Sequence, residues 1–181
     1  VAEPVAAVAA SLGAAPPAPL DAGGYPTLAV PEPLHHAPAF TVVVATRERS
    51  EPLRRCLESL ADLVYEGPFE VVVVDNVPTS DASETVVASF ADRLHIRYVR
   101  EDHPGLACAH NAGIAVTTTP YVAITDDDVI VDRYWLRRLA LGFGLADWVT
   151  CVTGMIRPAE LDHPAQLLLE QFGGYDKGLV P

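Results

Sequence analysis

Basic residues are scarce in this sequence. Lys and Arg together number 12 against 24 Asp and Glu, the formal net charge is -12 at pH 7, and Lys177 is the one lysine. Non-specific binding to nucleic acid or to an anionic membrane requires clustered basic side chains. We therefore expect no nucleic-acid partner, and an anionic substrate would need a metal ion between itself and the protein.

Cysteines and long apolar runs are also few. Cys56, Cys108 and Cys151 lie far apart and match no zinc or CxxC spacing, so we expect buried, reduced thiols in a cytoplasmic protein. The longest apolar stretch, residues 139–156, is interrupted by Asp147 and by glycines. It predicts a helix, a turn and a strand rather than a transmembrane segment. The first residues lack the basic start of a secretory signal.

The length allows one domain with a substantial core. The chain has 181 residues, and half of them are hydrophobic, which fits a single globular domain better than two. Residues 1–39 hold half of the sixteen prolines together with runs of alanine and show no periodicity. We expect a Pro/Ala-rich flexible lead there and the folded domain over residues 40–181.

Apolar segments alternate between strand and helix character. Runs of β-branched residues predict strands over residues 40–45, 70–74, 95–99, 121–125 and 148–155. Apolar residues at helical spacing predict helices over residues 53–60, 81–90, 106–116, 132–143 and 165–172, with Asp81 and Glu84 resembling a capping box. This order predicts an α/β fold, in which a mostly parallel sheet carries helices on both faces.

Polar residues follow three of the predicted strands. These clusters are Thr46-Arg47, Asp75-Asn76 and Asp126-Asp127-Asp128. The carboxyl ends of parallel strands share one edge of a sheet, and ligands bind beyond that edge. A carboxylate there can accept a hydrogen bond from a base imide or a ribose hydroxyl, an arginine can stack on a base, and an asparagine can both donate and accept. Each residue alone could be an ordinary loop residue, but together they predict a nucleotide pocket.

The three consecutive carboxylates at residues 126–128 repel one another, and a bound cation would relieve that repulsion. Mg²⁺, Mn²⁺ and Ca²⁺ prefer oxygen ligands, and Mg²⁺ is usually held by one or two carboxylates plus substrate phosphates. The stretch therefore predicts a metal–diphosphate site. The alternative is an acidic turn in front of the next helix, with Asp132 as the N-cap of that helix.

Four blocks of the sequence, taken in order, resemble family 2 glycosyltransferases. The blocks are Val43-Val44-Ala45-Thr46-Arg47-Glu48-Arg49, Val72-Val73-Val74-Asp75-Asn76, Gly105-Leu106-Ala107-Cys108-Ala109-His110-Asn111-Ala112-Gly113 and Thr125-Asp126-Asp127-Asp128. Each block alone is weak, but the set occurs in the family's order over about residues 40–175 and is specific. The resemblance implies the GT-A fold, a Rossmann-like nucleotide-sugar-binding architecture.

The resemblance also implies roles for individual residues. The implied substrate-binding residues are Thr46, Arg47, Glu48, Asp75, Asn76, Gly105, His110, Asn111, Asp126 and Asp127. Among them Asp75 would bind the base or the ribose, Asp127 would reach the donor sugar, and His110 stands where many relatives have an arginine. Asp126 and Asp128 would be the outer residues of the DxD motif and would hold Mn²⁺ or Mg²⁺, with Asp128 as the direct ligand.

The implied reaction is transfer of a sugar from a nucleoside-diphosphate sugar to an acceptor hydroxyl, with inversion by single displacement. A UDP-sugar is our first expectation, because Asp75 could accept from a uracil imide, while the acceptor is left open. The resemblance places the carboxylate base downstream of the DxD motif. The carboxylates left there are Glu160, Asp162, Glu170 and Asp176, none of them in a matching motif. The catalytic base is therefore not identified, and we expect a donor-binding portion, incomplete at the C-terminus, that lacks its acceptor half.

Two other enzyme classes share part of this pattern. A haloacid-dehalogenase-like phosphatase would carry its Asp-x-Asp on the first strand and a Thr or Val where Ile130 stands, and a sugar nucleotidyltransferase would need a glycine-rich first loop. Both fit poorly. A non-catalytic nucleotide-sugar and metal-binding module would bind the donor without hydrolysing or transferring it. A purely structural module would bind no nucleotide.

Overall fold

The computed structural model describes residues 30–159 and 162–173. The chain divides into two units, of which Glu32–Gly154 is one, and residues 1–31 with 155–181 form the other. The first unit contains the sheet and most of the helices. In the second, the described residues include one helix, α6 (Pro164–Gly173), close to the predicted range.

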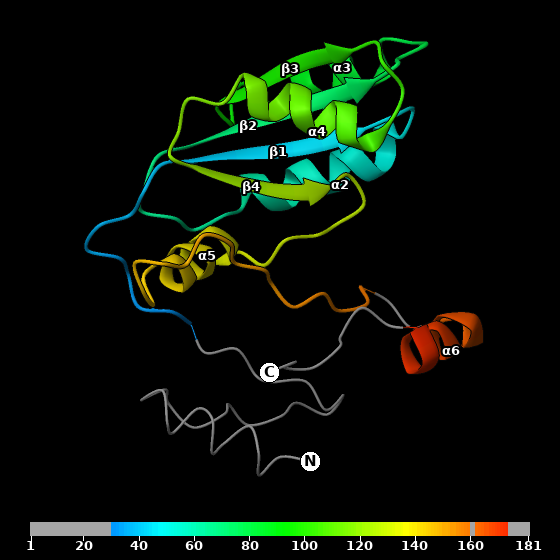
Figure 1. The fold of residues 1–181 in the computed structure, drawn as a ribbon. Coiled ribbons are helices and arrows are strands. Elements are labelled where there is room, and N and C mark those ends of the chain that lie inside the picture. The colour runs from blue at the N-terminus through cyan, green and yellow to red at the C-terminus, as the bar shows by residue number, and fades with distance from the viewer. Residues whose placement is uncertain (1–29, 160–161, 174–181) are drawn as a thin grey trace. The chain divides into compact units, whose positions relative to one another are not determined.

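The first unit is built on a four-stranded sheet. Its strands are β1 (Phe40–Thr46), β2 (Phe69–Asn76), β3 (Ile96–Glu101) and β4 (Tyr121–Asp126), in the order β3-β2-β1-β4. Every pair of neighbours is parallel, and all four arrowheads point the same way in Figure 1. The predicted parallel α/β architecture is confirmed. Each connection between the strands carries a helix, as parallel pairing requires.

Helices cover both faces of the sheet. Figure 1 shows α4 (Leu106–Ala115) on one face and α2 (Ser50–Ala61) on the other, where α3 (Ala82–Ala88) also packs. The face under α4 forms a small core of Val43, Ala45, Val72, Val74 and Ala109. The opposite face forms a larger core, to which α5 (Trp135–Phe143) contributes Leu136, Leu139 and Ala140. Because β1 and β2 are buried on both faces, they need continuous apolar runs rather than an alternating pattern.

Helix α4 lies very close to the sheet at a single small residue. A Cβ atom built on Gly113 would come within 2.5 Å of Val43 Cγ1 and 3.1 Å of Val74 Cγ2. Both valines are fully buried, so neither has room to move away. The absence of a side chain at Gly113 is therefore a packing requirement, and it fixes the distance between the helix and the strands.

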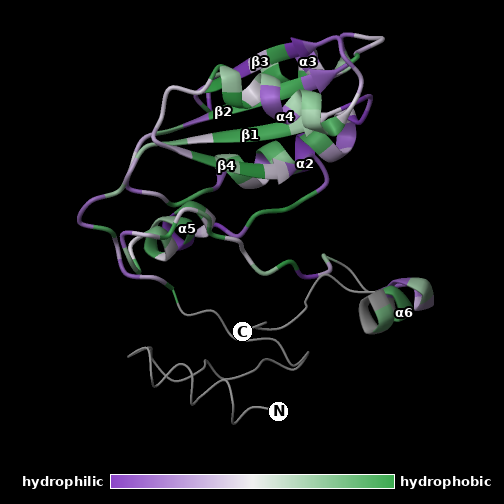
Figure 2. Cartoon of the chain, in the orientation of Figure 1, coloured by the Kyte–Doolittle hydropathy of each residue, from purple (hydrophilic) through white to green (hydrophobic). Residues whose placement is uncertain are grey.

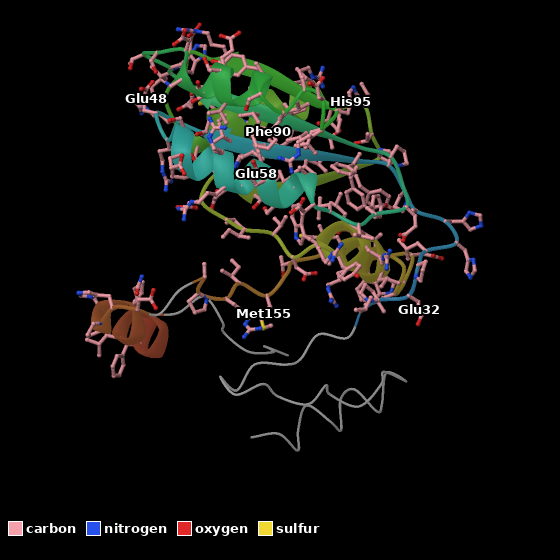
Figure 3. The ribbon with its side chains drawn as sticks, turned by 180° about the vertical axis from the view of Figure 1, so that it is seen from behind. Glu32, Glu48, Glu58, Phe90, His95 and Met155 are labelled. Atoms are coloured by element: carbon pink, nitrogen blue, oxygen red, sulfur yellow. The ribbon has the colours of Figure 1, made fainter. Side chains whose placement is uncertain are left out.

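The register of the strands brings the predicted polar clusters together. Thr46 is paired with Asp75, Ala45 with Asp126, and Asn76 with Glu101. Figure 2 shows hydrophobic residues through the middle of the sheet and hydrophilic ones toward the arrowhead ends of β2 and β3. In Figure 3, Glu48 lies at one end of the sheet and His95 at the other. The carboxyl edge, defined by residues 46–49, 75–77 and 126–128, is thus polar as predicted.

Several local predictions were wrong. Residues 148–155 form no strand: the backbone N–H of Val149 donates to Ala146 O in a turn, and Trp148 is 82% exposed. Their β-branched composition favours a strand, but a strand also needs a neighbour to pair with, and none of the described strands pairs with them. Asp132 is not the N-cap of α5: the N-cap is Tyr134, whose N–H donates to the Asp132 carboxylate, and the Asp132 carbonyl accepts from Trp135 N–H.

Two further predictions need correction. Asp81 is the N-cap of α3, as expected, but makes no side-chain capping hydrogen bond, so the capping box is not formed. The three cysteines are free, yet only Cys56 is buried, Cys108 is half-buried and Cys151 is exposed. Burial, reinforced by the nearby aspartates, raises the pKa of the Cys56 thiol to about 12, so this thiol is an inert core residue.

The predicted lead over residues 1–39 lies largely outside the described residues. Of its described part, Leu34 packs against the larger core, and the carbonyl oxygen of Pro38 accepts a hydrogen bond from the Tyr65 hydroxyl. Among the helices that the structure describes, none is both long and apolar enough to cross a membrane.

Candidate functional site

Asp75, at the end of β2, is a buried carboxylate with one oxygen left unpaired. It is 1% exposed, and its Oδ2 accepts from the Tyr98 hydroxyl at 3.1 Å. Its Oδ1 has no hydrogen-bond partner among the described residues. Burial raises the pKa of the Asp75 carboxyl, and this outweighs the opposite effect of the neighbouring Ser83 and Tyr98 hydroxyls. A buried acceptor without a donor is rare and indicates an absent partner or a functional role.

Asn76, the next residue, holds a loop in place. Its Nδ2 donates to the carbonyl oxygen of His103 at 2.7 Å, and its Oδ1 accepts from the backbone N–H of Gly105 at 2.8 Å. The amide is 5% exposed, so both of its ends are used within the protein. Asn76 therefore fixes the start of α4 against the end of β2.

Gly105 is the N-cap residue of α4 and has a backbone conformation that favours glycine. Its φ is +132°, a region that residues with a side chain rarely adopt. The two other predicted residues on this helix differ in exposure. The Nε2 atom of His110 is buried and has no hydrogen-bond partner among the described residues, whereas Asn111 is exposed.

Asp127, in the middle of the acidic run, points into the protein. It is 3% exposed. Its Oδ2 accepts from the Thr46 hydroxyl at 2.7 Å, and its Oδ1 forms an ion pair with Arg49 at 2.9 Å. Burial raises the pKa of the Asp127 carboxyl, and the Thr46 hydrogen bond and the Arg49 charge oppose that rise. Asp127 thus connects the end of β4 to the end of β1.

The flanking aspartates, Asp126 and Asp128, are exposed. The Arg49 guanidinium reaches Asp128 Oδ2 at 2.8 Å, and no described side chain pairs with the Asp126 carboxylate. Asp126 ends β4, and Asp127 and Asp128 lie in the turn that follows, which the hydrogen bond from Val129 N–H to the Asp126 carbonyl oxygen closes. The structure therefore separates the three carboxylates into one buried anchor and two that face solvent.

The loop after β1 places two further predicted residues at the edge. Arg47 is exposed, and within the described part of the chain no side chain pairs with it. Glu48 has a φ of +52°, and its carboxylate accepts from the backbone N–H of Thr79 at 2.7 Å. That backbone hydrogen bond is the main cause that lowers the pKa of Glu48. Glu48 thereby ties the loop after β1 to the loop after β2.

The acidic run can supply only part of the coordination shell of a divalent ion. Among the residues that the structure describes, no three His, Cys, Asp or Glu side chains converge on one point. Two exposed carboxylates, Asp126 and Asp128, nevertheless flank Asp127 in the chain, and one or two carboxylates plus substrate phosphates are the usual ligands of Mg²⁺. The donor set therefore fits an ion that shares its coordination shell with a bound diphosphate.

A hollow of about 510 Å³ lies away from this edge. Its lining includes His35, His36, Tyr121 and Phe143. Tyr121 begins β4, so the hollow lies near the amino end of that strand. Its lining contains none of the predicted substrate-binding residues.

Sequence reasoning missed three partners that the fold supplies. Tyr98 donates to Asp75 and His103 accepts from Asn76, and both come from or follow β3. Arg49 belongs to one of the matching sequence blocks, but its contacts with Asp127 and Asp128 were not expected. Arg49 and Asp128 are 79 positions apart in the sequence. Once the strand order is known, opposite charges at the ends of neighbouring parallel strands indicate such an ion pair.

The sequence is similar to known proteins of one family. Residues 41–166 match the family described as glycosyl transferase family 2. The chain is 36% identical over 111 residues to validoxylamine A glucosyltransferase of Streptomyces hygroscopicus subsp. limoneus, covering 60% of this chain and 24% of that protein. It is 31% identical over 101 residues to glycosyltransferase GlyA of Streptococcus pneumoniae serotype 4, covering 55% of this chain and 14% of that one.

The fold is likewise similar to a solved structure. The crystal structure of S. aureus TarS superposes with a TM-score of 0.52 at 23% identity, over 59% of this chain and 19% of that chain. The likeness supports the Rossmann-like GT-A architecture. The chain spans about a quarter of the first curated relative and less of the second. The family match extends over most of the chain, from β1 to the start of α6, and the chain therefore belongs to glycosyl transferase family 2.

Proposed function

We propose that this chain binds a nucleoside-diphosphate sugar at the carboxyl edge and forms the donor-binding part of a glycosyltransferase. The observation that carries the proposal is the unpaired, buried Oδ1 atom of Asp75. It lies at the same edge as the exposed carboxylates of Asp126 and Asp128, because the register aligns β1, β2 and β4 there. A nucleoside would supply a hydrogen-bond donor to Asp75 Oδ1, and a diphosphate would lie near Asp126 and Asp128.

The nucleoside end of the donor is assigned to Asp75. A base imide N–H or a ribose hydroxyl would satisfy its Oδ1 atom and would favour the charged carboxylate that burial disfavours. Arg47 is exposed on the neighbouring loop, where a guanidinium can stack on a base. Uracil has an imide donor of the right kind, so UDP is our first candidate. Asn76 and Glu48 contribute by holding the loops that border this position.

The diphosphate end is assigned to Asp126 and Asp128. These carboxylates would hold Mn²⁺ or Mg²⁺ together with phosphate oxygens. When bound, such an ion supplies Lewis-acid stabilisation of the leaving nucleoside diphosphate. Asp127 holds the acidic segment against Thr46 and Arg49, so that the two exposed carboxylates keep their positions.

Transfer with inversion needs a carboxylate that removes the proton from the acceptor hydroxyl. The four carboxylates that remain as candidates all lie in the unit formed by residues 1–31 and 155–181, not in the unit that carries the carboxyl edge. Glu160 and Asp176 lie outside the described residues, nothing is described of the Glu170 side chain, and Asp162 belongs to the other unit. We therefore assign donor binding to this chain and leave the base unassigned. A non-catalytic donor-binding module is the second candidate.

Thermal unfolding with nucleotides tests donor binding. UDP, GDP and dTDP are each added with Mn²⁺, with Mg²⁺ and with EDTA. A ligand at about a hundred times its Kd should add roughly 2.7 kcal/mol, which shifts the midpoint by several degrees. We expect one nucleotide to act only with metal, and Asp128→Asn to abolish its effect. Asp92→Asn removes the same charge at an exposed position far from the edge and should leave the shift intact.

The result that contradicts the proposal is the absence of any metal-dependent shift with all three nucleotides. A separate measurement distinguishes the enzyme from the binding module. Release of free UDP from a UDP-sugar that binds, followed by ³¹P NMR, indicates donor hydrolysis or transfer. Binding without any release supports the non-catalytic module.

A further inference from the structure

Arg49 holds two of the three aspartates with the two ends of one guanidinium. One terminal nitrogen lies 2.9 Å from Asp127 Oδ1, and the other lies 2.8 Å from Asp128 Oδ2. Arg49 is the N-cap residue of α2, so its backbone is fixed at the edge of the sheet. The side chain therefore bridges the ends of β1 and β4.

The two ends of this bridge are unequal. The Asp127 side chain is 5% exposed, and its other oxygen accepts from Thr46, so separating it from Arg49 would leave a buried charge without its cation. The Asp128 side chain is 48% exposed, and exposed ion pairs contribute little to stability. The Arg49 side chain is itself 48% exposed, but a buried charge that loses its partner is costly even when that partner reaches solvent. Arg49 can therefore release Asp128 easily while it stays on Asp127.

Asp128 is also the residue expected to bind the metal ion. Arg49 uses Oδ2 of this carboxylate, and a cation on the same carboxylate would be repelled by the guanidinium charge, so each weakens the binding of the other. The Arg49 guanidinium forms ion pairs with both Asp127 and Asp128. Arg49 thus occupies the position of a counter-ion.

We propose that Arg49 is a positioning residue that exchanges partners when the donor binds. In the free protein it neutralises Asp128. In the complex it keeps its contact with Asp127 and turns its other nitrogen from Asp128 to a phosphate oxygen of the donor. This inference rests on the proposed function, because it requires a diphosphate at this edge.

The chemistry of guanidinium suits such an exchange. Its planar fork of donors matches phosphate as well as carboxylate, and both ends can be used at once. A diphosphate bound next to Asp128 would lie near the nitrogen that Asp128 has just left. Arg49 would then offset donor charge that the ion alone does not neutralise. Lysine has a single charged point and cannot hold Asp127 and a phosphate in the same way.

Two binding measurements on the folded chain test this exchange. The first is the affinity for Mn²⁺ alone, from the EPR signal of free Mn²⁺. The second is the affinity for UDP at saturating Mn²⁺, from calorimetry. The variants are Arg49→Gln, Arg49→Lys and the control Arg54→Gln. Arg54 is exposed on the same helix, so its replacement removes an equal charge without touching the aspartates.

The expected changes have opposite signs. Arg49→Gln removes a positive charge beside the proposed metal ligand and should tighten Mn²⁺ binding by at least about fivefold, because a neighbouring unit charge costs each charge of the ion about 1 kcal/mol even in water. It should weaken UDP binding by about tenfold or more, the usual effect of losing a hydrogen bond to a charged group. Arg49→Lys should leave Mn²⁺ binding within about twofold of wild type but weaken UDP binding. Arg54→Gln should change both affinities by less than about twofold, as expected for a distant exposed charge.

Unchanged or weaker Mn²⁺ binding by Arg49→Gln would overturn the exchange, because a residue that merely supports the loop should weaken both ligands when it is lost. Unchanged UDP binding would overturn the phosphate contact.

Circular dichroism checks that each variant is folded. If Arg49→Gln is unfolded, weaker UDP binding by Arg49→Lys supports the proposal and unchanged binding contradicts it. If wild type binds Mn²⁺ but no UDP, the proposed function fails and the phosphate contact with it, whereas tighter Mn²⁺ binding by Arg49→Gln still supports the competition at Asp128.

Discussion

The Thr46 hydroxyl donates to Asp127 Oδ2 at 2.7 Å and joins the end of β1 to the acidic run after β4. Both residues are buried, at 4% and 3% exposure. The hydrogen bond is therefore charge-assisted and shielded from water, where it is stronger than a neutral one. It sets the direction of the middle aspartate and, through the chain, that of its two exposed neighbours.

Replacing Thr46 by valine should destabilise the protein. The change keeps the shape of the side chain but removes the donor, and an unsatisfied buried acceptor costs about 1–3 kcal/mol, more when it is charged. Thr46→Ser keeps the hydroxyl and is the matched control. Urea unfolding at pH 7 measures the difference in the free energy of unfolding. Equal stability of the valine and serine variants would show that the hydrogen bond does not hold Asp127.

Replacing Asp75 by asparagine should have opposite effects on stability and on nucleotide binding. Burial raises the Asp75 pKa above its ordinary value of 3.8. The neutral acid is therefore favoured in the folded state, and that contribution is present below about pH 4 and is lost as pH rises through the raised pKa. Asp75→Asn should match wild type at low pH and exceed it at pH 7 by about 1–3 kcal/mol, while UDP binding is lost.

Thermal unfolding from pH 4 to 7 measures this difference, at roughly 2–4 °C per kcal/mol for a chain of this size. Asp92→Asn serves as the control, since its carboxylate is exposed. A lower midpoint for Asp75→Asn than for wild type at pH 7 would mean that the carboxylate is needed for folding. Asp75 would then be a structural residue rather than one held in readiness for a ligand.

The strands could be predicted from the sequence because burial on both faces leaves a plain mark, the valine-rich runs of β1 and β2. The polar clusters at their ends could be predicted for the same reason, since parallel pairing places them on one edge. The direction of each aspartate could not. The burial of Asp127 depends on Thr46 and Arg49, which lie about 80 positions earlier in the sequence.

The absent fifth strand has a related cause. Residues 148–155 have strand composition, but pairing is a property of two segments, and the described sheet ends at β4.

The role of Asn76 could not be predicted for a similar reason. Its residue type suggested a ligand contact, whereas both ends of its amide bind the backbone of the loop before α4. Residue type alone cannot say which of several donors and acceptors is nearest.

Replacing Asn76 by alanine should loosen that loop. The His103 carbonyl and the Gly105 N–H would both lose their partner, and each lost hydrogen bond costs about 0.5–1.5 kcal/mol. Hydrogen exchange at the Gly105 amide should become faster, and α4 should fray at its first turn. Asn111→Ala, an exposed position on the same helix, is the control. Unchanged exchange at Gly105 in the Asn76 variant would contradict the clamp.

Replacing Gly113 by alanine should also destabilise the protein, although alanine is the better helix former by about 1 kcal/mol. The new methyl group would meet Val43 Cγ1 at 2.5 Å, and overpacking of this kind typically costs 1–3 kcal/mol. Gly144→Ala adds the same group at ordinary contact distance, 3.4 Å from the nearest carbonyl oxygen, and should be tolerated. Denaturant unfolding compares the two, and equal stability would show that α4 can move away from the sheet.

The most direct test of the central claim is calorimetric titration of UDP into the wild-type chain, once with Mn²⁺ and once with EDTA, and into Asp75→Asn with Mn²⁺. If the carboxyl edge is a donor site, UDP binds saturably to one site in Mn²⁺, and binding disappears both in EDTA and in Asp75→Asn. Binding that survives in EDTA and in the variant would place the nucleotide elsewhere. Absence of binding by wild type in Mn²⁺ would contradict the assignment of a UDP site to this edge.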